Sequence, residues 1–270
     1  MFSSCSKVRV VELPESLRTI GCNCFSTCTA LIKINIPSGV TELGELAFYH
    51  CHSLKKIILP QGIQHLPTQV FCGCEALVSI KLPLRIKTIG SGAISGCSSL
   101  VSVNFHELKE LESIGGSAFA RCALVKVDLA ELPELKDIGE RAFMECSSLT
   151  DFVFPSNLTI IKLHTFHNCS SLAYVKLPPS LQTLETPIFT KCPSTLRIEA
   201  SDDISEALLR YIMSLNDGSF KIVNSEGAPF PAPTETDDSC LATMEVDSCL
   251  ATTEVRNCQR LLNIFDDSTR

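Results

Sequence analysis

Cysteine and histidine are the residues of this sequence best suited to chemistry. The chain of 270 residues holds fifteen cysteines and six histidines. One group, His-Cys-His, spans residues 50–52, and a second group of two histidines and a cysteine spans residues 164–169. A thiol beside an imidazole could form a cysteine nucleophile, since the histidine can accept the thiol proton. The C-x-C pairs at residues 22–24 and 72–74 are possible metal ligands.

The spacing of the cysteines favours a structural role instead. Eight of them recur every 23 to 25 residues: Cys28, Cys51, Cys74, Cys97, Cys122, Cys146, Cys169 and Cys192. Three positions before each stands an apolar residue, namely Phe25, Phe48, Phe71, Ile94, Phe119, Phe143, Phe166 and Phe189. Zinc ligands come as close pairs that converge on one point, whereas free cysteine commonly packs as a small buried hydrophobe. We therefore expect these cysteines in the core, with no catalytic, cofactor or metal site.

A short alternating run follows each cysteine and predicts a β-strand. The run LIKINIP at residues 31–37 should point Leu31, Ile34 and Ile36 inward and Lys33 and Asn35 outward. Proline ends most of these runs because it cannot donate to a strand ladder, as at Pro37, Pro60, Pro83, Pro155 and Pro178.

A second apolar segment follows and commonly ends in glycine: Gly21, Gly44, Gly90, Gly115 or Gly139. These positions should be ones where a side chain would be crowded or where φ is positive. One such repeat cannot bury its own apolar face, so the repeats must stack in chain order. The sequence thus predicts a β-rich solenoid of about eight repeats over residues 8–200, with short parallel strands that begin with residues 8–14.

The repeats resemble the BspA-like class of leucine-rich repeats. The segments LIKINIPSGVTELGELAFYHCHSL and LVSIKLPLRIKTIGSGAISGCSSL carry the resemblance most fully, and it extends over about residues 8–198. It implies a binding scaffold, found both in surface adhesins and inside cells, with no shared catalytic residues. Departures from the pattern are Ile94 in place of Phe, residues 66–67 and 161–162 in place of Ile-Gly, and extra residues in the repeats that close at Cys122 and Cys146.

The outward strand positions form the surface that a solenoid offers to partners. Five lysines on it predict a mildly basic stripe, with apolar contact area from three other residues. The candidate partner-binding residues are Lys33, Lys56, Ile58, Lys81, Lys126, Val153, Tyr174 and Lys176. We expect an acidic or mixed protein surface as the partner; the alternative is that these lysines keep an exposed sheet soluble.

The carboxyl-terminal part changes its pattern. Residues 202–215 have helical spacing, with Asp202 and Asp203 as the expected N-terminal cap, and residues 221–223 could add an edge strand, so residues 201–223 should close the solenoid. Residues 224–270 are acidic, contain the tandem DSCLATMEV and DSCLATTEV, and are expected to be disordered. A short partner-binding helix at residues 255–270 is the alternative to a frayed tail.

Charge and hydropathy exclude several classes of function. Residues 1–200 hold 18 basic against 17 acidic residues, and residues 201–270 hold 5 against 13, so we expect no nucleic-acid partner. No apolar run is long enough for a membrane span or a secretory leader, which predicts a cytoplasmic scaffold for protein binding with no small-molecule substrate. The alternatives are an extracellular adhesin whose leader is missing, with Asn157 and Asn168 as glycan acceptors, and a Cys/His-dependent enzyme.

Overall fold

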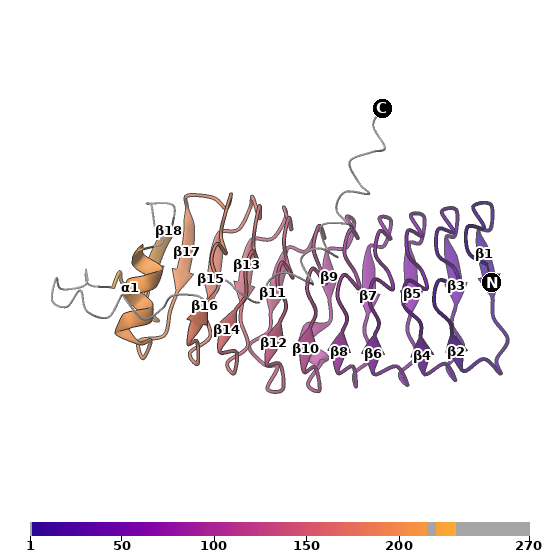
Figure 1. Ribbon diagram of the computed structural model, residues 1–270, viewed down its shortest axis with the longest axis horizontal. Coiled ribbons are helices and arrows are strands. Elements are labelled where there is room, and N and C mark those ends of the chain that lie inside the picture. The colour runs from indigo at the N-terminus through magenta and orange to yellow at the C-terminus, as the bar shows by residue number, and fades with distance from the viewer. Residues whose placement is uncertain (1, 215–219, 231–270) are drawn as a thin grey trace, which may run out of the picture. The chain divides into compact units, whose positions relative to one another are not determined.

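The protein is a parallel β-solenoid that closes with one helix. The computed structural model describes residues 2–214 and 220–230. Most turns contribute one three-residue strand and one two-residue strand, and successive turns lie side by side in chain order (Figure 1). The predicted fold class is therefore confirmed.

The longer strands form two five-stranded parallel sheets, which we call the long-strand face. The first sheet consists of β1 (Val10–Glu12), β3 (Lys33–Asn35), β5 (Lys56–Ile58), β7 (Ser79–Lys81) and β9 (Ser102–Val103). The second consists of β11 (Lys126–Asp128), β13 (Asp151–Val153), β15 (Tyr174–Lys176), β17 (Leu196–Glu199) and β18 (Phe220–Val223). The predicted orientation holds, since Ile34 and Ile36 are buried while Lys33 and Asn35 are exposed.

The short strands form three parallel sheets in a row, which we call the short-strand ladder, and the sequence did not reveal them as strands. They are β2 (Thr19–Ile20), β4 (Glu42–Leu43), β6 (His65–Leu66), β8 (Thr88–Ile89), β10 (Ser113–Ile114), β12 (Asp137–Ile138), β14 (Ile160–Ile161) and β16 (Thr183–Leu184). Each is the second apolar segment of its repeat. Its inner residue is buried, and its outer residue is exposed or partly exposed.

The repeated phenylalanines form a stack through the core. The rings of Phe25 and Phe48 lie 5.5 Å apart and those of Phe48 and Phe71 lie 5.4 Å apart, nearly parallel in both cases. Ile94 interrupts the stack, which resumes from Phe119 onward. Phe2 continues the stack at the amino-terminal end, 5.6 Å from Phe25, so an additional partial repeat precedes the first one that the sequence indicated.

The repeated thiols bond to the backbone of the preceding turn. Cys51 Sγ donates to the Phe25 carbonyl at 3.2 Å, and Cys97 Sγ donates to the Phe71 carbonyl at 3.3 Å. All eight cysteines of the register make the equivalent bond. A small side chain with a weak donor thus fits a buried position that faces a carbonyl oxygen.

Crowding, and not backbone conformation, requires four of the five repeated glycines, namely Gly44, Gly90, Gly115 and Gly139, whereas a Cβ on Gly21 would meet no atom within 4 Å. A Cβ on Gly44 would overlap the backbone of Cys22, and one on Gly90 would lie 2.8 Å from the Leu66 carbonyl oxygen. Neither glycine has a positive φ. Positive φ occurs instead five residues and one residue before most of the repeated cysteines, often at non-glycine residues such as His50.

The helix begins later than its acidic residues suggested. α1 spans Glu206–Ser214, and the Ser205 hydroxyl accepts the backbone N–H of Leu208 at 3.2 Å, which makes Ser205 the cap. The proposed caps were wrong: Asp202 instead accepts a hydrogen bond from Ser225 Oγ at 2.5 Å. The expected edge strand is present as β18, beside β17.

Part of the segment assigned to the tail packs on this cap. Val223 forms a bridge with Pro229, and Phe230 packs partly buried against the core. Residues 231–270, including the tandem repeat and the expected helix at 255–270, lie outside the described residues.

Candidate functional site

The long-strand face aligns the candidate residues in rows that cross the strands. Lys33 and Lys56 are direct partners in neighbouring strands, as are Ile58 and Lys81. In the second sheet, Val153 is the partner of Lys176. The structure thus brings the predicted residues together in two groups, one on each sheet.

The first group retains unpaired positive charge. The side chains of Lys33 and Lys56 are exposed and form no ion pair with any residue that the structure describes. The same holds for Arg9 and Lys55, which stand directly before β1 and β5 and which the sequence analysis did not select. Four cations therefore cluster over the first turns.

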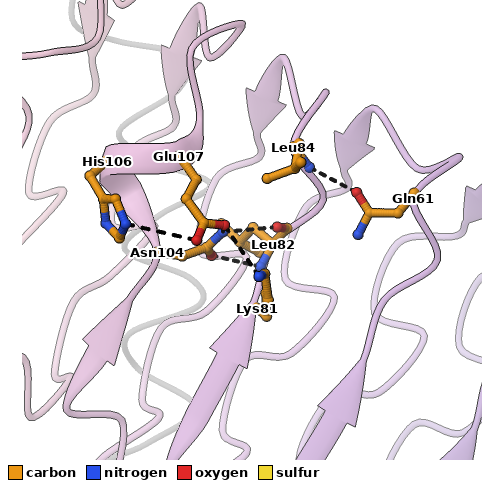
Figure 2. Close-up of polar contacts among 7 residues, drawn as sticks. All are labelled: Gln61, Lys81, Leu82, Leu84, Asn104, His106 and Glu107. Atoms are coloured by element: carbon orange, nitrogen blue, oxygen red, sulfur yellow. Dashed lines mark hydrogen bonds and ion pairs between the residues drawn. The ribbon is translucent and has the colours of Figure 1, made fainter.

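A polar cluster marks the boundary between the two sheets. The extra residues of the repeat after β9 form the 3-10 helix η1 (Phe105–Glu107). Asn104 bonds to both backbone groups of Leu82: its Oδ1 accepts from the N–H at 2.9 Å and its Nδ2 donates to the carbonyl at 3.1 Å (Figure 2). This amide takes the place of a strand residue at the point where β9 ends.

Glu107 neutralises the lysine beside this boundary. It accepts a hydrogen bond from Asn104 Nδ2 at 3.0 Å and lies 3.4 Å from Lys81 Nζ (Figure 2). The bond from Asn104, followed by the interaction with Lys81, lowers the pKa of Glu107. Lys81 is therefore ion-paired, so it adds less net positive charge to the predicted basic stripe than Lys33 and Lys56 do.

The lysines of the second group, on the second sheet, are also neutralised by carboxylates. Lys126 pairs with Asp151 at 3.3 Å. Lys176 Nζ and the Tyr174 hydroxyl both donate to Glu199, at 2.9 and 2.7 Å. Burial and the bond to Glu199 raise the pKa of Tyr174 to about 12. Burial alone would raise the pKa of Glu199, but the bonds from Tyr174 and Lys176 outweigh it and lower this pKa.

Exposed valines form a feature that the sequence pattern did not predict. Val78, Val101 and Val125 hold the same repeat position in three consecutive turns, and their exposed fractions are 51, 44 and 41%. The alternating pattern did not identify them because they precede the strands. Their position after the repeated leucine was the available signal.

In the first cysteine and histidine group, residues 50–52, the thiol is buried and bonds to the backbone. The Cys51 thiol is directed at the Phe25 carbonyl, and burial raises its pKa to about 12. His50 Nδ1 lies 3.3 Å from His52 Nε2, and His52 Nδ1 lies 3.0 Å from Glu75. At neutral pH the thiol is protonated and hydrogen-bonded to backbone, which does not favour a nucleophile.

In the second cysteine and histidine group, residues 164–169, the thiol is likewise bonded to a backbone carbonyl. The Cys169 thiol donates to the Phe143 carbonyl at 3.2 Å, and burial raises its pKa. The rings of His164 and His167 meet edge to face at 5.4 Å. Among residues 2–214 and 220–230, no group of three His, Cys, Asp or Glu side chains has the geometry to hold a metal ion.

Comparison with known proteins identifies the family. The description "BspA type Leucine rich repeat region (6 copies)" matches residues 1–126, 79–197 and 136–220. The chain belongs to this family of leucine-rich repeat proteins. The search of curated proteins found no match.

Solved bacterial structures share the fold. A leucine-rich cell surface protein of Faecalibacterium prausnitzii is 19% identical, with a TM-score of 0.51, over 84% of this chain and 83% of that chain. The pneumococcal vaccine antigen PcpA is 16% identical, with a TM-score of 0.53, over 81% of this chain and 68% of that chain. At these identities the likeness concerns the fold alone. In the part of the chain that the structure describes, no helix has the length and apolar character needed to cross a membrane.

Proposed function

We propose that this protein is a non-enzymatic scaffold that binds protein partners through the long-strand face. The main support is the exposed aliphatic surface of that face. Ile58 is 64% exposed there, and the exposed valines Val78, Val101 and Val125 lie in adjacent turns. Contiguous exposed apolar surface rimmed by charge is typical of protein-binding sites. The repeated thiols support the non-enzymatic part, because burial keeps them protonated at neutral pH.

The proposed location is the cytoplasm. All the cysteines that the structure describes are unpaired, and exposed Cys22 would be open to oxidation outside the cell. Proteins rich in free thiols are typical of reducing compartments.

A cell-surface role is the second candidate. The structural neighbour from Faecalibacterium prausnitzii carries a cell-surface description, and Asn157 and Asn168 are both exposed in acceptor tripeptides. A glycan found at Asn157 in the native protein by mass spectrometry would support this candidate over the cytoplasmic one.

Site-specific photo-crosslinking tests the binding face. A photoreactive amino acid replaces Ser79 on the long-strand face or, as the matched control, Thr19 on the short-strand ladder; both are exposed strand positions. In lysate of the native cell, we expect Ser79 to yield a discrete crosslinked polypeptide and Thr19 to yield none. Equal crosslinking at the two positions, or none at Ser79, contradicts the proposal.

A further inference from the structure

One row along the solenoid carries two cations, separated by a partly buried isoleucine, over the first turns and three exposed valines over the turns that follow. We call it the leading row, because its members stand immediately before the strands: Arg9, Ile32, Lys55, Val78, Val101 and Val125. Each residue from Ile32 onward donates its backbone N–H to the carbonyl of the residue before it in the row, at 2.8 to 3.4 Å. The row is therefore continuous across six turns.

The basic half of this surface is under electrostatic strain in the free protein. Lys33 and Lys56 are direct partners on strands about 4.8 Å apart, where like charges repel. Arg9 and Lys55 add charge at the leading-row positions on either side of Ile32, and the nearby acid Glu12 leaves the group net positive. The other candidate lysines of the face each have a carboxylate, so a carboxylate is the group that this half lacks.

The aliphatic half adjoins the basic half without a gap. Val78 follows Lys55 in the leading row, and Ile58 lies on the same strand as Lys56. Burial of exposed valine and isoleucine side chains against a partner is favourable, at about 25 cal/mol per Å² of apolar area. No aromatic side chain occurs in the leading row, so stacking of nucleic-acid bases has no platform there.

These observations specify the chemistry of a ligand. We infer that the leading row binds an extended protein segment that is acidic at one end and aliphatic at the other, laid across the strands. Three residues of extended chain span about 10 Å, the distance across two rungs of the ladder. Carboxylates spaced three residues apart thus reach Arg9 and Lys55, and the following aliphatic residues reach Val78 and Val101. This inference rests on the proposed function and names its partner class.

The test uses the full chain and a synthetic probe. A fluorescein-labelled dodecapeptide carries four glutamates in its first half and four aliphatic residues in its second half, with serine elsewhere. A second peptide replaces the aliphatic residues with serine, and a single-stranded DNA of matched charge serves as a polyanion. Fluorescence anisotropy gives the three affinities.

Charge reversal should separate the two sides of the solenoid. We expect Arg9→Glu with Lys55→Glu, the two leading-row cations, to weaken the bipartite peptide about tenfold or more, because attraction becomes repulsion. The matched control, Lys87→Glu with Lys136→Glu, changes the net charge equally but lies beside the short-strand ladder, and it should have little effect. Circular dichroism checks that each variant is folded.

Loss of the valines should affect only one probe. Val78→Thr with Val101→Thr keeps the branched shape suited to a sheet, so the fold is retained. It should weaken the bipartite peptide several-fold and leave the serine-substituted peptide unchanged.

Three results would overturn the inference. They are equal losses in the two charge-reversal pairs, equal affinity for the two peptides, and tighter binding of the DNA, which indicates a general polyanion site. If Ser79 still crosslinks to a partner in lysate while the peptide results fail, the proposed function stands and the partner class is wrong. If neither Ser79 nor the probes report binding, the proposed function fails as well.

Discussion

At the scale of single residues, the repeated cysteine combines two properties that a buried position in a tight turn requires. Its side chain is small enough for the space beneath the adjacent phenylalanine, and its thiol bonds to a carbonyl of the preceding turn. Serine is also small, but burial of its hydroxyl group is more costly. Burial also raises the pKa of both Cys51 and Cys146 to about 12, from an ordinary value of 9.0.

These raised pKa values predict a loss of stability in alkaline solution. Below about pH 9 the thiols are protonated in both the folded and the unfolded chain, so they add no pH dependence. Between about pH 9 and 12 only the unfolded chain releases these protons, and unfolding becomes more favourable as pH rises. We expect the melting temperature to fall from pH 9 to 11, measured by circular dichroism. Cys51→Ala with Cys146→Ala should flatten this slope, and an unchanged slope would contradict the explanation.

At the scale of elements, the sequence repeat predicts the strands. It does not predict the ion pairs between side chains of neighbouring turns. The alternation at residues 31–37 correctly placed β3 because each inward residue has an equivalent in every turn. Whether a lysine is neutralised depends instead on the neighbouring turn. Lys81 meets Glu107 only because extra residues form η1 and turn that carboxylate toward the face (Figure 2).

The short strands and the positive φ positions escaped prediction for a related reason. A two-residue strand is too short to show alternation, and it is defined only by its bonds to the adjacent turns. The positive φ at Leu46 and Arg121 is imposed by the tight turn, although neither residue type favours it.

Two glycines at the same repeat position allow a test of the close contact between successive turns. Gly44 and Gly21 hold the same repeat position, but a Cβ on Gly44 would overlap the Cys22 backbone, whereas a Cβ on Gly21 would meet no atom within 4 Å. Gly44→Ala should therefore destabilise the protein by about 2 kcal/mol or more. Gly21→Ala should leave stability unchanged or raise it by about 0.4–1 kcal/mol through the unfolded chain. Urea denaturation compares them, and equal losses would show that crowding is not the cause.

At the scale of the described solenoid, stability is distributed among contacts between neighbouring turns. α1 buries Leu208 and Ile212 against the last turns, and β18 pairs with β17 (Figure 1). The carboxyl-terminal end thus has a cap that shields the apolar interior from water.

Weakening this cap should act locally. Leu208→Ala with Ile212→Ala removes apolar contacts worth about 2–5 kcal/mol each. In hydrogen exchange followed by mass spectrometry, we expect faster exchange in β15 to β18 and unchanged exchange in β3 to β7. Ser214→Ala, at the exposed end of α1, is the control and should resemble the native chain. Uniformly faster exchange along all strands would indicate that the solenoid unfolds as a single cooperative unit.

The interruption at η1 has a consequence for how such a protein can diverge. Because Asn104 completes the bonding of Leu82 within the first sheet, the longer strands before and after η1 belong to two separate sheets, while the short-strand sheet β6 to β12 continues past η1. Gene duplication or loss of a whole repeat on one side therefore leaves the exposed residues on the other side in register. Two recognition areas on one molecule can then acquire different specificities independently.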